Sequence, residues 1–370
     1  MAQLLKINKS VDQGLIAFLE DLLKEKKVGG VVSLKKIRGG PGISYSLITR
    51  PEELDDALPL FPLMPANSGK ILSRLTLRGP LKDPVAVVLR PCELRAFIEL
   101  VKRKQGSLEN FVFISPTCPG VYPLEMSVDG DLEALASRYQ DQVRSGPDIP
   151  EIRPACRSCV YFTPHNADII VSLIAEEGLD RSCSLFLNTK KGEALADGMA
   201  GEKREQDLSS QELARFSEHR KAARQKLFDD MGAETKGIQG LIKLFGKCIG
   251  CHACGNACPI CYCDLCFFES QPNESRPSSY QADLEKKGAS RIPAGTLFYH
   301  IGRMAHMSVS CVGCGMCMDV CPVRIPVGTL FSRVGEAVQK TFEYTPGINV
   351  EEPLPVAVYK EEEFAQIGES

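Results

Sequence analysis

Hydrophobic positions along the first half of the chain alternate between a helical and a strand-like period. After Ser10, apolar side chains recur at helical spacing as far as Leu23, and Ser10 with Gln13 has the spacing of a capping box. A second helical pattern covers residues 93–104. Short apolar runs predict strands at residues 31–34, 85–89, 111–114, 168–173 and 182–187. Alternating helices and strands, some buried on both faces, predict an α/β domain.

The second half of the chain is more polar and is predicted to be mainly helical. Residues 190–236 are charge-rich, which predicts a connector helix with a solvated outer face. A helix is predicted at 294–307, where the apolar stripe consists of Leu297, Ile301, Met304 and Ala305. The Pro/Glu-rich tail is expected to be an extended arm or loose. We therefore expect an α/β domain (1–190), a helical connector (191–240), a mainly helical domain (241–340) and a tail (341–370).

Length, charge and cysteine content narrow the classes of protein to consider. The chain has 370 residues, 44 Lys+Arg against 47 Asp+Glu, and no Trp, so no basic surface for nucleic acid is predicted. It has no apolar run long enough to span a membrane and no signal peptide at its start, so we expect a cytoplasmic protein without direct membrane insertion. Its sixteen cysteines are unusual for that compartment and indicate metal ligation or redox chemistry.

Eight of the cysteines form two copies of one motif. Each copy reads C-x2-C-x2-C-x3-C-P, and the copies start at Cys248 and Cys311. In two-cluster ferredoxins, the fourth cysteine of each such motif ligates the other cluster. We therefore expect one 4Fe-4S cluster on Cys248, Cys251, Cys254 and Cys321. The second is expected on Cys311, Cys314, Cys317 and Cys258.

Two alternatives concern the cysteine-rich region. Structural zinc is the other interpretation of the motif, although zinc sites more often show two separated C-x2-C pairs. Three further cysteines, Cys261, Cys263 and Cys266, either tune a nearby cluster or join a ligand such as Cys183 in a fourth cluster. The histidines His300 and His306 are expected to be packed or capped rather than ligands.

The chain resembles the beta subunits of formate dehydrogenases and hydrogenases that use the deazaflavin coenzyme F-420. The resemblance covers most of the chain, and the order of its domains is that of the formate dehydrogenase branch. It rests on residues 90–96, 156–163, 167–169 and 258–263, and on the second cysteine motif with its 304–307 lead-in.

The resemblance implies FAD and a further, proximal 4Fe-4S cluster in the α/β domain. The matching cysteines are Cys92, Cys118, Cys156 and Cys159. The first two follow the strands predicted at 85–89 and 111–114, at the sheet edge where ligands bind in open α/β folds. Ordinary buried cysteines are the alternative for these two taken alone.

No common dinucleotide or phosphate-loop motif is present, so the flavin is placed by the resemblance only. It implies contacts from the start of the first helix and from a loop and strand end further on: Asp12, Gln13, Gly14, Asn67, Ser68, Gly69, Lys70, Arg90 and Arg95. A helix N-terminus does attract phosphate. An ordinary capped helix and an ordinary turn are the alternative.

Two departures from the family pattern leave the hydride carrier undecided. It is F-420, NAD(P)H, or there is none. Tyr161 and His165 replace acids, and no glycine follows Asp168-Ile169. We expect an iron–sulfur flavoprotein subunit, catalytic only within a complex. Its expected partner is a formate dehydrogenase or hydrogenase catalytic subunit or a heterodisulfide-reductase-like complex. The alternative is a flavin-free iron–sulfur subunit that links two redox enzymes.

Overall fold

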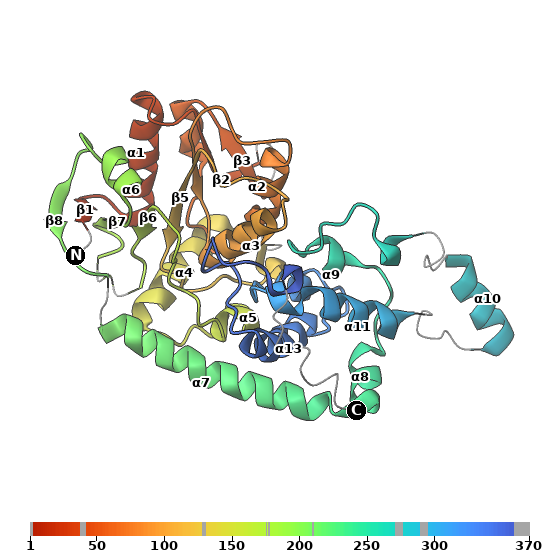
Figure 1. Ribbon diagram of the computed structural model, residues 1–370. Coiled ribbons are helices and arrows are strands. Elements are labelled where there is room, and N and C mark those ends of the chain that lie inside the picture. The colour runs from red at the N-terminus through yellow and green to blue at the C-terminus, as the bar shows by residue number, and fades with distance from the viewer. Residues whose placement is uncertain are drawn as a thin grey trace, which may run out of the picture.

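A mixed eight-stranded sheet organises the N-terminal part of the computed structural model (Figure 1). The structure describes residues 3–37, 42–127, 131–174, 176, 178–208, 211–270, 277–288 and 295–358. The strand order is β3-β2-β4-β5-β6-β7-β1-β8, and β2, β4, β5 and β6 run parallel. The strands are β1 (Gln3–Ile7), β2 (Gly30–Lys36), β3 (Ile43–Ile48), β4 (Val85–Val88), β5 (Phe111–Pro116), β6 (Ile169–Val171), β7 (Cys183–Leu187) and β8 (Glu202–Glu205).

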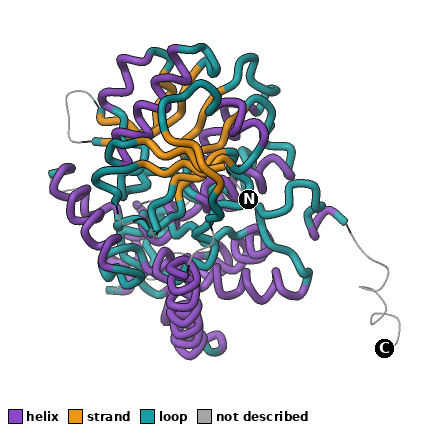
Figure 2. Tube along the Cα trace, turned by 90° about the vertical axis from the view of Figure 1, so that its left-hand side faces the viewer, coloured by secondary structure: helices purple, strands orange, loops and turns teal. Residues whose placement is uncertain are grey.

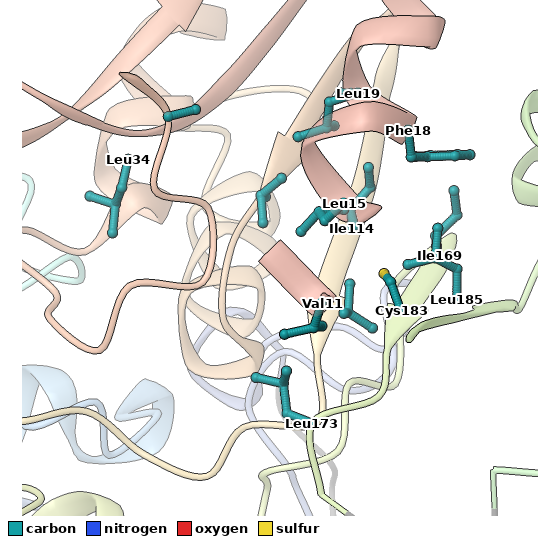
Figure 3. Close-up of a cluster of buried hydrophobic side chains, with 14 of the residues drawn as sticks. Val11, Leu15, Phe18, Leu19, Leu34, Ile114, Ile169, Leu173, Cys183 and Leu185 are labelled. Carbon is teal, nitrogen blue, oxygen red and sulfur yellow. The ribbon is translucent and has the colours of Figure 1, made fainter. Parts of the chain in front are cut away.

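Helices cover this sheet, which lies between them in the view of Figure 2. They are α1 (Val11–Lys24), α2 (Ser68–Thr76), α3 (Pro91–Lys102), α4 (Leu132–Ser145), α5 (Pro154–Arg157) and α6 (Lys190–Leu195). The Ser10 hydroxyl accepts a hydrogen bond from Gln13 N at 3.4 Å, so α1 begins where the sequence predicts. Leu15, Phe18 and Leu19 of α1 pack towards Ile114 and Leu185 of the sheet (Figure 3).

The C-terminal part is helical and lies beside the α/β part (Figure 1). Its helices are α7 (Gln211–Glu234), α8 (Gly237–Phe245), α9 (Ala253–Asn256), α10 (Pro277–Lys287), α11 (Thr296–Met307), α12 (Met316–Asp319) and α13 (Val327–Thr341). The long helix α7 contacts both α5 and α13, so it joins the two parts. In the described part of the chain, every helix is too short or too polar to cross a membrane.

The structure differs from the predicted elements in several places, and helices α2 and α4 are among the elements that were not predicted. Strands β1 and β3 were not predicted, and β8 lies inside the expected helical connector. Helix α11 buries Tyr299, His300, Arg303 and Met307, while Ile301 of the predicted stripe is exposed. The apolar stripe is therefore not the buried face. Most of the expected tail is described as far as residue 358, and its remainder lies outside the described residues.

Candidate functional site

Two strand ends and one short helix bring together the first group of cysteines. Strands β4 and β5 pair in parallel, so the loops that follow them leave the same edge of the sheet. Cys92 lies in the first turn of α3 and Cys118 two residues after β5. Cys156 lies in α5, and Cys159 follows it. Gly120 permits a close approach, because a Cβ there would lie 3.0 Å from the Cβ of Cys156.

The four thiols of this N-terminal group interact electrostatically. Burial raises the pKa of Cys118 to about 12, and Cys156 and Cys159 add to the rise. Burial likewise raises the pKa of Cys92, with contributions from Cys118 and Cys159. The predicted set Cys92, Cys118, Cys156 and Cys159 is therefore brought together.

The first cysteine motif gathers around Cys321, far away in sequence. Burial raises the pKa of Cys248, and Cys254, Cys251 and Cys321 add to the rise. The pKa of Cys254 is raised by burial and also by Cys321 and Cys251. Backbone groups donate to two of these sulfurs, Gly250 N to Cys248 Sγ at 3.5 Å and Ile325 N to Cys321 Sγ at 3.3 Å. We call Cys248, Cys251, Cys254 and Cys321 the distal group.

The second motif gathers with Cys258. Burial raises the pKa of Cys317, and the Cys314 and Cys311 thiols add to the rise. The pKa of Cys258 is raised by its hydrogen bond with Cys261 and by burial, with a further contribution from Cys314. We call Cys258, Cys311, Cys314 and Cys317 the middle group.

The middle group adjoins both others. Burial is the main cause of the raised pKa of Cys92, and the interaction with Cys314 is the next largest. On the other side, Cys254 contributes to the raised pKa of Cys317, and the two side chains share one hydrophobic cluster. The three groups thus lie in the order N-terminal, middle, distal.

Helix α11 supplies polar side chains to the distal group. Arg303 Nη1 donates to Cys254 Sγ at 3.1 Å, and the Tyr299 hydroxyl lies 3.7 Å from the same sulfur. His300 Nε2 lies 3.4 Å from Cys248 Sγ, and its ring stacks on Phe245. Arg303 and Tyr299 were not predicted from the sequence to be site residues. Tyr299, Arg303 and Met307 follow one another at intervals of four residues, which places them on one face of a helix. This spacing was the signal in the sequence that could have identified them.

The donor set fits iron–sulfur clusters. Arg303 is a buried cation whose Nε has no hydrogen-bond partner, and it faces sulfurs that are anionic when they ligate iron. Across the described ranges, no three His, Cys, Asp or Glu side chains are placed to hold a single metal ion.

The residues around the start of α2 contact the cysteine-rich part. Lys70 Nζ donates to the carbonyl oxygens of Asn256, Cys258 and Cys261, at 2.8, 3.3 and 3.1 Å. Burial raises the pKa of Cys314 to about 11, and the Asn67 side chain opposes that rise. These residues join the two parts of the molecule.

The backbone donors at the start of α2 already have partners. Ser68 N donates to Glu93 Oε1 at 2.9 Å, and Gly69 N donates to Asn67 Oδ1 at 3.0 Å. A Cβ at Gly69 would lie 2.6 Å from the Glu93 carbonyl oxygen, so α2 packs closely on α3. This helix start does not fit a phosphate-binding site.

The other residues implied for the flavin belong to α1 and α3. Arg90 donates to the carbonyl oxygens of Phe61 and Leu63, and Arg95 to those of Pro346 and Val312. At the start of α1, Asp12 borders a cavity of about 210 Å³ with mostly apolar walls, and Gln13 is exposed. Gly14 packs against Cys183 of β7, because a Cβ there would lie 2.3 Å from the Cys183 Cβ. Phe61, which accepts from Arg90, also lines the cavity beside Asp12, and a FAD site formed by these residues stays a prediction.

The surplus cysteines border a second cavity. Cys261, Cys263 and Cys266 line a space of about 450 Å³ together with Tyr299 and His306. The hydrogen bond from Cys258 lowers the pKa of Cys261. Cys183 lies elsewhere, in the core under α1, where Figure 3 shows it.

The departures from the family pattern lie near Arg95. Its guanidinium stacks over the Tyr161 ring, 4.0 Å from the centroid. Burial and the charge of Arg95 lower the pKa of His165. Neither residue offers the acid that the family pattern has.

Comparison with known proteins adds to this geometry. The family described as 4Fe-4S dicluster domain matches residues 244–325, which hold all eight motif cysteines. The chain carries a 4Fe-4S dicluster domain. That domain therefore contains both the middle and the distal group.

Two curated relatives are similar over nearly the whole chain. The F-420-dependent formate dehydrogenase subunit beta of Methanocaldococcus jannaschii is 26% identical over 365 residues, which cover 90% of this chain and 91% of that protein. The F-420-dependent formate dehydrogenase 1 subunit beta of Methanococcus maripaludis is 26% identical over 374 residues, with 91% of each chain covered. The predicted resemblance and the prediction of an oxidoreductase subunit are confirmed.

One chain of a solved structure is also similar to this chain. A chain of the F-420-reducing NiFe hydrogenase complex from Methanosarcina barkeri is 15% identical, with a TM-score of 0.44. The match covers 65% of this chain and 94% of that one.

Proposed function

We propose that the chain is an iron–sulfur electron-transfer subunit of a multi-subunit oxidoreductase. The observation that carries the proposal is the meeting of cysteines from distant parts of the sequence in three adjoining groups of four. When bound, 4Fe-4S clusters supply one-electron transfer. The role of the protein is to supply the thiolates, exclude water and fix the order of the groups.

The order of the groups defines a path for electrons through the molecule. The N-terminal group lies at the sheet edge and the distal group at the other end, where Cys251 is exposed. The middle group separates the two. We therefore propose that a redox partner exchanges electrons at the exposed distal end.

The proposed partner is a formate dehydrogenase or hydrogenase catalytic subunit, or a heterodisulfide-reductase-like complex. The names of the curated relatives, which are beta subunits of formate dehydrogenases, support the first of these. The same names, which include F-420, support F-420 over NAD(P)H as the hydride carrier.

A flavin-free subunit is the second candidate, and a specific observation favours it. The predicted donors Lys70, Ser68 N and Gly69 N are all bonded within the protein. FAD remains the implication of the family resemblance, and we derive no step from it. Flavin-free and flavin-containing forms share the same iron–sulfur role.

Metal and flavin analysis of anaerobically purified protein tests the proposal. Three clusters require about twelve iron atoms per chain, with an equal amount of acid-labile sulfide. Acid release of the cofactors then separates the two candidates, because flavin at about one per chain identifies the FAD form and its absence the flavin-free form. A colourless, iron-poor preparation would contradict both.

A further inference from the structure

Arg303 is a buried cation that contacts a cysteine sulfur and has no carboxylate partner. It lies on α11, between the two cysteine motifs, and is 3% exposed. Nη1 donates to Cys254 Sγ and Nη2 to the Cys254 carbonyl oxygen, both at 3.1 Å. Its other neighbours include the Met307 sulfur, the Cys261 thiol, and the rings of Tyr299 and Phe331. Within the described part of the chain, no Asp or Glu forms an ion pair with it, so its charge is balanced mainly by sulfur.

The same helix directs two further side chains at the distal group. The Tyr299 hydroxyl lies 3.7 Å from Cys254 Sγ, and His300 Nε2 lies 3.4 Å from Cys248 Sγ. Both side chains are buried. Since Arg303 follows Tyr299 by one helical turn, a single rigid element holds all three residues on two of the four sulfurs.

The arginines near the other groups are engaged differently. Arg153, beside the middle group, forms a buried ion pair with Asp319, and Arg224 pairs with Glu336 at 2.6 Å. Beside the N-terminal group, Arg220 donates to the carbonyl oxygens of Cys118 and Pro119 and not to a thiol. Arg95, buried near Cys92 and Cys159, forms no ion pair within the described residues and donates to the carbonyl oxygens of Pro346 and Val312. Of these five arginines, only Arg303 combines an unpaired charge with a hydrogen bond to a cysteine sulfur.

We propose that Arg303, assisted by Tyr299 and His300, raises the reduction potential of the distal cluster. The inference rests on the proposed function. Reduction adds one negative charge to a cluster, and a buried positive charge together with hydrogen bonds to its sulfurs stabilises that charge. With clusters bound, Arg303 would supply the charge that favours an electron at the exposed end near Cys251. An electron transfer oxidises one cluster and reduces the other, and no bond or proton is exchanged.

The test is a redox titration of the full chain, followed by electron paramagnetic resonance. In Arg303→Gln, we expect the equilibrium constant for reduction of the distal cluster to fall at least tenfold, which is a lower potential by about 59 mV for one electron. The Arg303 charge also acts on Cys258, so a smaller decrease is expected in the middle cluster. Arg303→Lys keeps the charge and should recover part of the difference. The paramagnetic resonance signal of the distal cluster is identified as the signal that changes in Cys251→Ser.

A matched control removes a charge close to the same cluster but in solvent. Arg324 follows Cys321 by three residues, and its side chain is 81% exposed. Arg324→Gln should leave all the potentials unchanged, because water screens an exposed charge. A shift in Arg324→Gln as large as that in Arg303→Gln would overturn the proposal.

A second variant keeps the test decisive where Arg303→Gln fails to bind iron. Tyr299→Phe keeps the ring and its packing, and it should lower only the distal potential, by less than Arg303→Gln. An unchanged or raised distal potential in Tyr299→Phe, or an unchanged one in an iron-loaded Arg303→Gln, would overturn the inference. Absence of the clusters from the wild-type chain would instead refute the proposed function.

Discussion

Burial of the cysteines sets the chemistry of the site residue by residue. Burial raises the pKa of Cys118 to about 12 and that of Cys314 to about 11, so without iron these thiols keep their protons at neutral pH. The ligand form is the thiolate. Cluster assembly must therefore release protons, and the positive iron replaces them. The folded chain alone disfavours free thiolates at these positions.

Cys321→Ser tests the crossed ligation at a single residue. Because Cys321 contributes to the raised pKa of Cys248 and Cys254, the variant should damage the distal cluster and lower the iron content by up to about four per chain. Iron analysis and paramagnetic resonance measure both effects. Cys183→Ala is the matched control, since Cys183 lies in the apolar core under α1, and it should leave the iron content unchanged. Loss of the middle signal alone would contradict the crossed assignment.

Asp12 gives a pH-dependent prediction. Burial raises its pKa above 3.8, so the folded state holds the proton more tightly than the unfolded state does. The carboxylate then costs stability at neutral pH, and the cost disappears as the pH falls towards 3.8. Asp12→Asn should raise the thermal midpoint of unfolding at pH 8 and raise it less at pH 5.

The Asp12→Asn variant keeps its local contact. Gln140 Nε2 donates to Asp12 Oδ2 at 3.0 Å, and the asparagine oxygen can accept the same bond. Asp21→Asn is the control for removing a carboxylate from the same helix. If Asp12→Asn raised the thermal midpoint more at pH 5 than at pH 8, burial of the Asp12 carboxylate would not explain the effect.

At the scale of elements, the sequence predicts best where local signals and tertiary contacts agree. Helix α1 begins at its cap, and β4 and β5 form where apolar runs occur. Strand β3 carries exposed and half-buried residues, and β8 is exposed throughout, so neither has a buried pattern to detect. These edge strands depend on pairing with β2 and β1.

The face of α11 shows why part of the site could not be predicted. Its buried side includes His300, which was expected to be packed, and Arg303, which lies outside the predicted apolar stripe. They are buried because cysteine sulfurs, together with the rings of Phe245 and Phe331, lie against them. The cysteine motifs, by contrast, could be read directly from their spacing. The residues that surround the ligands need the fold to be known.

Helix α2 provides a prediction about how the two parts of the molecule hold together. Lys70→Met removes three hydrogen bonds to the segment that contains Cys258. A hydrogen bond to a charged group contributes about 1.5–3 kcal/mol, so opening of this segment should become easier. Hydrogen exchange over residues 253–266 should accelerate in the variant. Arg74→Met, which changes an exposed residue on the same helix, should leave exchange unchanged, and equal acceleration in both variants would contradict the role of Lys70.

At the scale of the whole molecule, the two parts of the chain are built around one line of cysteines. The N-terminal group belongs to the sheet edge, yet Cys92 adjoins Cys314 of the dicluster domain. The ion pair between Arg153 and Asp319 crosses the same boundary. The α/β part therefore packs against the dicluster domain at the point where an electron would cross, so its position is fixed relative to the middle group.

This arrangement predicts that the middle cluster couples the other two magnetically. The dipolar interaction between unpaired electrons falls with the cube of distance, so neighbouring reduced clusters broaden each other's signals. Cys314→Ser should remove the middle cluster, lower the iron content by about four per chain and leave two sharp, independent signals in the fully reduced protein. Cys251→Ser should instead leave one interacting pair, because the N-terminal and middle groups remain adjacent. If Cys314→Ser still showed an interacting pair while Cys251→Ser did not, the middle position would belong to another group, and the path through the molecule would have to be redrawn.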